Sequence, residues 1–121
     1  MPRRPNEAEC RIEDVVARIG GKWKLLILRQ LIYGGTLRFG ELQRRVTGIT
    51  QTMLTKQLRE LAADGLVLRV AYAEVPPRVE YSATPSAHAL DAFFQSMHRW
   101  GEANLPPRAA TQRRRGQDAA D

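Results

Sequence analysis

The stretch that decides the fold runs from Arg38 to Tyr81 and has the sequence RFGELQRRVTGITQTMLTKQLRELAADGLVLRVAYAEVPPRVEY. Its periodicity predicts a short helix at about 39–46, a tight turn at 47–49 and a second helix from 51 to about 63. A basic β-hairpin follows. Elements in this order are typical of a helix-turn-helix motif with a wing.

The helix after the turn carries two faces. Leucines at 54, 58 and 61 follow helical spacing and form a core stripe. The second face is made of Thr52, Thr55, Lys56 and Arg59, and it contains no acid. Such a face suits a DNA major groove, where base edges offer acceptors and phosphates attract cations. The alternative is that Lys56 and Arg59 only solvate an exposed helix, but the turn and the hairpin on either side favour nucleic-acid binding.

Upstream of this motif, apolar spacing predicts a helix from Ile12 to Ile19 that stops at Gly20-Gly21. The next helix, about 22–33, is apolar almost all round, so we expect it to be central and buried. A very short strand is expected at 36–38. Thr50 should cap the second helix of the motif, and Gly65 should stop it.

Downstream, residues 74–77 should form the wing tip, because proline cannot continue a strand ladder, and 78–83 should form the return strand. A last helix is expected from Thr84 to about Asn104, roughly 30 Å long. Its apolar side is formed by Leu90, Phe93, Phe94, Met97 and Trp100. Large exposed apolar stripes usually mark an interface, so we expect this helix and the first one to form a homodimer. The alternative is that it packs wholly on its own domain.

Composition indicates one globular domain. The chain has 121 residues, 43% of them hydrophobic and 26% charged, with a net charge of +6. Of that charge the tail, 108–121, contributes +2 and the N-terminal arm, 1–9, contributes none, so +4 lies in the domain, 10–107. We expect the arm to be flexible and the basic tail to be disordered, acting on DNA as an electrostatic arm or simply solvated. A basic domain favours polyanionic partners.

The residue inventory argues against an enzyme. One cysteine and two well-separated histidines leave no intramolecular disulfide and no metal cluster, so no metal and no cofactor is expected. His88 and His98 have no carboxylate arranged for catalysis. No segment is long and apolar enough for a membrane span, and no signal peptide is evident, so a cytoplasmic, nucleoid-associated protein is expected.

Ten short blocks follow one another along the chain in a fixed order. They are Cys10, IGGKW at 19–23, LLIL at 25–28, RF at 38–39, EL at 41–42, GIT at 48–50, Leu54, LREL at 58–61, DGLV at 64–67 and VPPRVEY at 75–81. In these blocks the chain resembles the HxlR-type subgroup of winged helix-turn-helix regulators, which are related to the MarR class. The resemblance spans about residues 10–101. Two departures are Arg11, where the family usually has proline, and Thr50, where it usually has serine.

This resemblance implies a mostly α fold with a small β-hairpin, dimerised through the terminal helices. It also implies a bacterial transcription factor, most often a repressor, bound as a homodimer to a palindromic operator. Gln51, Thr52, Thr55, Lys56 and Arg59 match the family's groove-facing positions, and Arg78 matches its wing arginine. The expected DNA-binding set also includes Arg38, placed just ahead of the motif for a phosphate contact, and the capping residue Thr50. The rival hypothesis is a winged-helix module that binds an acidic protein without sequence-specific DNA recognition.

Some members of the resembled family respond to oxidants, quinones or aldehydes through an N-terminal cysteine at the place of Cys10. Arg11 and the nearby helix N-terminus could supply the positive environment that such a thiol needs. The alternative is that Cys10 is a small packing residue. Trp23 and Trp100 are candidates for lining an effector cavity between the last helix and the core, although core packing is the favoured explanation for both.

Overall fold

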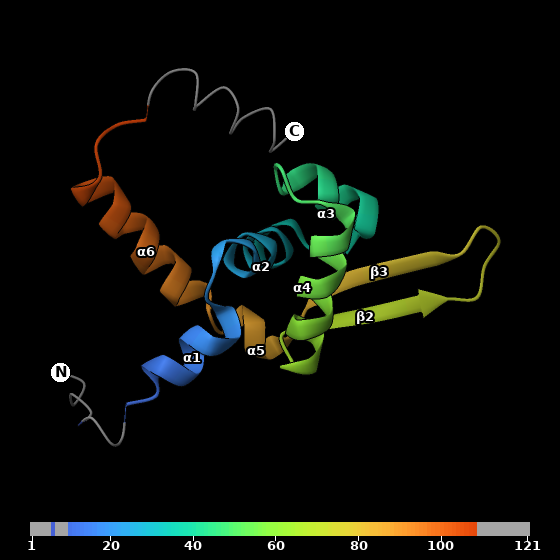
Figure 1. Cartoon of the computed structure of the whole chain (residues 1–121), viewed down its shortest axis with the longest axis horizontal. Coiled ribbons are helices and arrows are strands. Elements are labelled where there is room, and N and C mark those ends of the chain that lie inside the picture. Colours follow the sequence, from blue (N-terminus) through green and yellow to red (C-terminus); the bar gives the residue numbers. More distant parts are fainter. Residues whose placement is uncertain (1–5, 7–9, 109–121) are drawn as a thin grey trace.

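The computed structural model describes residue 6 and residues 10–108, so the expectations for the arm and for most of the basic tail lie outside the described residues. The elements are α1 (Ile12–Ile19), α2 (Lys22–Gly34), β1 (Leu37–Arg38), α3 (Phe39–Arg45), α4 (Gln51–Ala63), β2 (Val67–Tyr72), β3 (Arg78–Ala83), α5 (Pro85–His88) and α6 (Asp91–Asn104). They are drawn in Figure 1.

The winged helix-turn-helix expected from the sequence is confirmed. The strands form an antiparallel sheet in the order β1-β3-β2, with Leu37 opposite Tyr81 and Val67 opposite Ala83. The short strand at 37–38 therefore joins the hairpin instead of standing alone. Figure 1 shows the β2–β3 hairpin extending from one side of the molecule beyond α4 as the wing.

The core lies where α2 crosses α4. Ile27, Leu28 and Leu31 of α2 are fully buried, and the predicted leucine stripe of α4 packs into the same cluster. The expectation that α2 is buried all round is wrong, because Leu26 is 37% exposed and Tyr33 is 51% exposed. The domain covers only one side of this helix, so its uncovered side remains at the surface.

The expectation of one long C-terminal helix from Thr84 is also wrong. Thr84 caps α5, accepting a hydrogen bond from the Ala87 amide at 3.3 Å, but the helix stops after His88. The Leu90 amide then bonds to the Ala87 carbonyl at 2.9 Å, a tighter turn than the α-helical repeat. Leu90 packs half-buried against the core, so the turn keeps this side chain inside before α6 begins.

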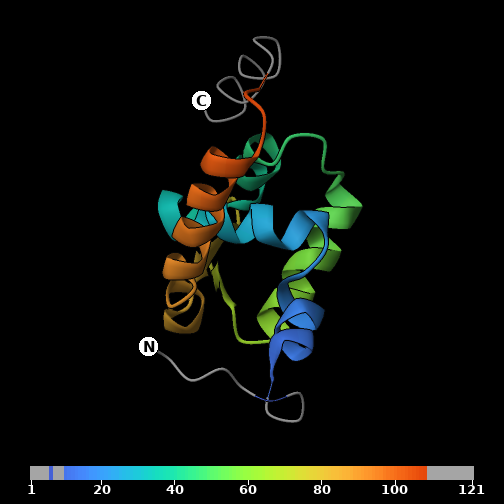
Figure 2. The same cartoon turned by 90° about the vertical axis from the view of Figure 1, so that its left-hand side faces the viewer.

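After this turn α6 runs along the side of the molecule opposite the wing, as Figure 1 shows. Figure 2 looks onto that side and shows α1 and α6 at the surface with α2 between them. Within the described residues, no helix has the length and apolar character needed to cross a membrane.

Candidate nucleic-acid interface

A tight turn sets the start of α4 at the protein surface. Gly48 adopts a φ of +86°, a conformation that side chains rarely tolerate. Two residues later the Thr50 hydroxyl accepts a hydrogen bond of 3.1 Å from the Met53 amide, which confirms the predicted N-cap. Gln51 and Thr52 are therefore exposed in the first turn of a capped helix.

The predicted groove face of α4 is assembled as expected. Thr52, Lys56 and Arg59 are exposed, and Thr55 lies half-buried at its edge. Glu60, the acid that follows Arg59 in the chain, pairs with Lys24 of α2 at 3.5 Å. Because the Lys24 side chain is only 11% exposed, this ion pair holds Glu60 toward α2 and leaves the groove face cationic.

Thr55 differs from Thr52 in one respect. Its hydroxyl donates to the Gln51 carbonyl one turn earlier, at 2.9 Å. Such a bond to the backbone is a common alternative use of a threonine hydroxyl inside a helix.

Arg38 precedes α3, and its backbone amide donates to the Glu41 carboxylate at 3.0 Å. Its side chain is exposed. In the sheet, Arg38 of β1 lies opposite Glu80 of β3, a strand of the wing. The Arg38 side chain is therefore accessible at the surface, and its contact with a DNA phosphate stays a prediction.

The wing is not basic, contrary to the expectation from the sequence. Residues 67–83 contain Arg69 and Arg78 but also Glu74 and Glu80, so their formal charges cancel. Arg78 pairs with Glu74 at 3.0 Å and with Glu80 at 3.8 Å, and its guanidinium lies 3.9 Å from the centre of the Tyr72 ring. The positive charge of Arg78 is therefore compensated within the hairpin itself.

Arg69 was not singled out from the sequence. It is exposed on β2, opposite Tyr81 of β3, and no ion pair binds it within the described part of the chain. Strand alternation could have revealed it, because Arg69 is the only cation between the two ends of β2.

A second surface is apolar and lies on α1 and α6. Of the residues predicted for dimerisation, Phe93, Met97 and Trp100 are exposed, with Trp100 at 61%, whereas Leu90 and Phe94 pack half-buried against the core. On α1, the exposed apolar residues are Ile12, Val15 and Val16. The predicted stripe is therefore divided between the core and the surface.

A hollow of about 900 Å³ lies beside this surface, between α2, α6 and the segment that follows α6. Arg29 and Tyr33 line it from α2, and Phe94, Met97 and Leu105 from the other side. Neither tryptophan lines it. Trp23 packs against the core instead, and Trp100 is exposed. The hypothesis of a cavity between the two tryptophans therefore has no support in this hollow.

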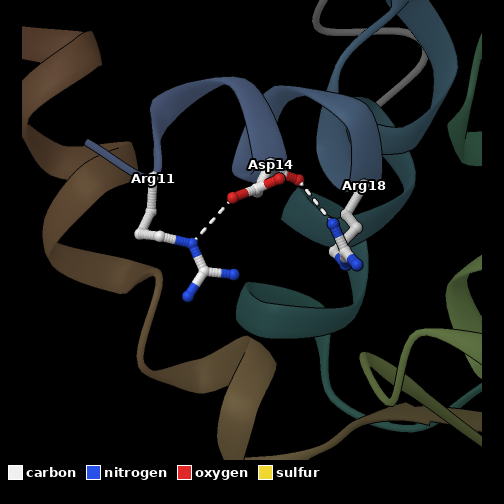
Figure 3. Close-up of polar contacts among 3 residues, drawn as sticks. All are labelled: Arg11, Asp14 and Arg18. Carbon is white, nitrogen blue, oxygen red and sulfur yellow. Dashed lines mark hydrogen bonds and ion pairs between the residues drawn. The ribbon is translucent and has the colours of Figure 1, made fainter. Parts of the chain in front are cut away.

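Cys10 lies half-buried just before α1, and its amide bonds to the Asn6 carbonyl at 3.0 Å. The neighbouring Arg11 is engaged elsewhere. Figure 3 shows its Nε bonding to the Asp14 carboxylate, at 2.7 Å, while Arg18 donates to the Asp14 carbonyl at 2.9 Å. The charge of Arg11 is thus shared with Asp14. Among the described residues, no group of three potential metal ligands lies together.

Comparison with known proteins places this geometry in a family. Residues 18–109 match the sequence model of the HxlR-like helix-turn-helix family. The HTH-type transcriptional regulator YybR of Bacillus subtilis is 47% identical over 100 residues, which are 83% of this chain and 79% of YybR. The relatives with solved structures include two regulators that are studied in defined redox states.

The first is the redox regulator HypR in its oxidized form, with a TM-score of 0.73 and 45% identity, covering 81% of this chain and 100% of that one. The second is the reduced form of the transcriptional regulator YodB from B. subtilis, with a TM-score of 0.72 and 32% identity, covering 82% and 96%.

Proposed function

This chain belongs to the HxlR-like helix-turn-helix family of transcriptional regulators, and we propose that it represses transcription as a homodimer bound to a palindromic operator. Its matched relatives are regulators, so the chain is a DNA-binding transcriptional regulator and not an enzyme. Such a protein acts at the nucleoid in the cytoplasm.

The observation that carries this proposal is the groove face of α4. Exposed Thr52, Lys56 and Arg59 belong to a capped helix, and the Lys24–Glu60 ion pair directs the Glu60 carboxylate toward α2. Hydroxyl and amide side chains near the helix N-terminus can bind base edges. The cationic side chains of Lys56, Arg59 and Arg38 can bind phosphates. The proposed interface also includes Gln51 and Thr55 of α4 and Arg78 of the wing. Thr50 caps the N-terminus of α4.

Two copies are needed to recognise a palindrome. The exposed apolar residues of α1 and α6 support a two-fold interface, because a surface of this kind is costly to leave in water. In a dimer the two α4 helices would enter successive major grooves, roughly 34–36 Å apart. In the proposed repression, a dimer seated on an operator that overlaps a promoter would block polymerase by occupancy alone.

We also propose that oxidants or electrophiles control this repression through Cys10. The support is the similarity to HypR, a redox regulator, together with the half-buried position of Cys10 at the start of α1. Because α1 also belongs to the proposed dimer surface, a modification at Cys10 would be transmitted to the spacing of the two DNA-binding units. With one cysteine in the chain, a disulfide can form only between chains or with a small thiol.

The experiment that tests DNA recognition compares two duplexes. One carries the inverted repeat recovered by selection from a random duplex pool, and the other is a scrambled duplex of the same length. Gln51→Ala and Thr52→Ala should cost roughly 1–3 kcal/mol on the selected repeat and little on the scrambled one. Fluorescence anisotropy across a salt series measures both, and Ser86→Ala, exposed on α5, is the matched control.

Failure of this test has a definite form. If both variants bind both duplexes as the wild type does, α4 is not the recognition surface. A wild-type protein whose binding showed no linear loss of log affinity with log salt would favour the rival interaction module, since counterion release accompanies phosphate contact.

A further inference from the structure

One side chain of the groove face has already used its hydrogen-bond donor. The Thr55 hydroxyl donates to the Gln51 carbonyl at 2.9 Å, and a hydroxyl has only one proton. Thr52, one turn earlier, is exposed and makes no side-chain hydrogen bond within the described residues. The two threonines of this face are therefore chemically different toward a base edge, although the sequence makes them equivalent.

The bond also fixes the orientation of the Thr55 side chain. Threonine is branched at Cβ and stiff at χ1, so holding Oγ1 against the Gln51 carbonyl fixes the γ-methyl as well. Turning the hydroxyl toward a base would break an existing hydrogen bond. Thr55 is also half-buried at the edge of the face, where an apolar contact excludes water more readily than at exposed Thr52.

In the major groove, only thymine offers a methyl group to an apolar side chain. We propose that Thr55 recognises a thymine in each half-site through contact between its γ-methyl and the C5-methyl of the base, while Thr52 recognises its base by hydrogen bonding. This inference rests on the proposed function, in which α4 enters the major groove.

Two substitutions of Thr55 separate its methyl from its hydroxyl. Thr55→Val keeps the methyl and removes the hydroxyl, so it should retain operator affinity. Thr55→Ser keeps the hydroxyl and removes the methyl, so it should weaken binding roughly three- to fivefold per half-site, the value of one methyl group removed from water. At Thr52 the order should reverse, with Thr52→Val weaker than Thr52→Ser.

The matching change in DNA replaces thymine by deoxyuridine, which lacks only the C5-methyl. Each thymine of the selected inverted repeat is replaced in turn, symmetrically in both half-sites, and binding is measured by anisotropy. We expect one position at which deoxyuridine weakens binding by the wild type and by Thr55→Val, but not by Thr55→Ser. That loss of effect is the coupling that a double-mutant cycle detects. Thermal melting checks that each variant is folded.

Several results would overturn this inference. They are a repeat without thymine in its half-sites, no thymine position that couples to Thr55, or a Thr55→Val variant that binds as weakly as Thr55→Ser. If Gln51→Ala and Thr52→Ala still lose operator affinity in that case, only the role of Thr55 is wrong. If they lose none either, α4 is not the recognition surface, and the proposed function fails with the inference.

Discussion

Tyr33 at the end of α2 donates a hydrogen bond of 2.5 Å to the carboxylate of Asp91 at the start of α6, 58 residues further along the chain. Gln95, one turn into α6, lies within 3.4 Å of the Tyr33 hydroxyl and 3.5 Å of the same carboxylate. This polar cluster ties α6 to the domain just after the turn at Leu90. It therefore fixes the direction in which the apolar side of α6 faces at the surface.

The hydrogen bond between Tyr33 and Asp91 should make the stability of the folded state depend on pH. The hydrogen bond to Asp91, then desolvation and the negative charge of Asp91, raise the pKa of Tyr33 above its ordinary value of 10.0. The folded state thus holds the phenol proton more tightly than the unfolded state does. The stabilising contribution is complete below the unfolded pKa and is lost as pH rises through the folded one.

Asp91→Asn should therefore lower the pH at which Tyr33 ionises, followed by the ultraviolet absorbance of the phenolate. The chain has three tyrosines, so Tyr33→Phe identifies which part of the titration belongs to Tyr33. If the titrations of wild type and Asp91→Asn coincide, the hydrogen bond to Asp91 does not form in solution.

The Tyr33–Asp91 contact could not be predicted from the sequence. From spacing alone, Asp91 would lie one helical turn from His88 on one continuous helix. The turn at Ala89–Leu90 separates these two residues into different helices, and the partner of Asp91 comes from α2. The turn forms where Leu90 packs against the core. A local sequence pattern does not predict such a tertiary contact.

The groove face of α4, by contrast, could be predicted almost completely. Its helical period, the Thr50 cap and the Gly48 turn are local features, and the structure has all three. The sequence does not reveal which hydrogen bond or ion pair each polar side chain makes. The partners of Arg78, the hydroxyl bond of Thr55 and the Lys24–Glu60 pair depend on which side chains the fold brings together.

The Thr50 cap predicts a measurable loss of stability. Thr50→Ala leaves the Met53 amide without its partner in the first turn of α4, and it should lower the free energy of unfolding by roughly 1 kcal/mol. Thr50→Ser keeps an oxygen at the same place and should stay close to wild type. Urea denaturation of the three proteins checks this, and equal midpoints for all three would mean that water replaces the cap without cost.

The proposed dimer predicts different outcomes for substitutions at two residues of α6. Trp100 is 61% exposed in the single chain, so Trp100→Glu should disrupt the dimer while leaving a cooperatively folded monomer. Phe94 packs against the core, so Phe94→Asp would bury a charge and should unfold the protein. Light scattering and thermal melting distinguish these results. A wild type that scatters as a 13.7 kDa monomer at micromolar concentration would refute the dimer.

The redox proposal predicts a selective effect at Cys10. Cys10→Ser should bind the operator as the wild type does but remain bound when diamide or a quinone is added. Anisotropy follows release from DNA, and non-reducing gels show whether the oxidised wild type is linked between chains or capped by a small thiol. Equal release of both proteins would assign Cys10 a packing role only.

Because Glu74 and Glu80 compensate the charge of Arg78, substitutions in the wing test the proposed contact of Arg78 with DNA. Arg78→Ala should weaken the operator and a scrambled duplex by the same factor and reduce the salt slope by about one, because a phosphate contact carries no sequence information. Glu74→Gln should strengthen both, since it removes the carboxylate 3.0 Å from the guanidinium and releases Arg78 toward DNA. Anisotropy on both duplexes across a salt series measures the two variants side by side.

A loss of affinity confined to the operator would mean that Arg78 contacts bases. No loss on either duplex would mean that Arg78 serves only its contacts with Glu74 and Tyr72, and that exposed Arg69 is the wing cation to replace next.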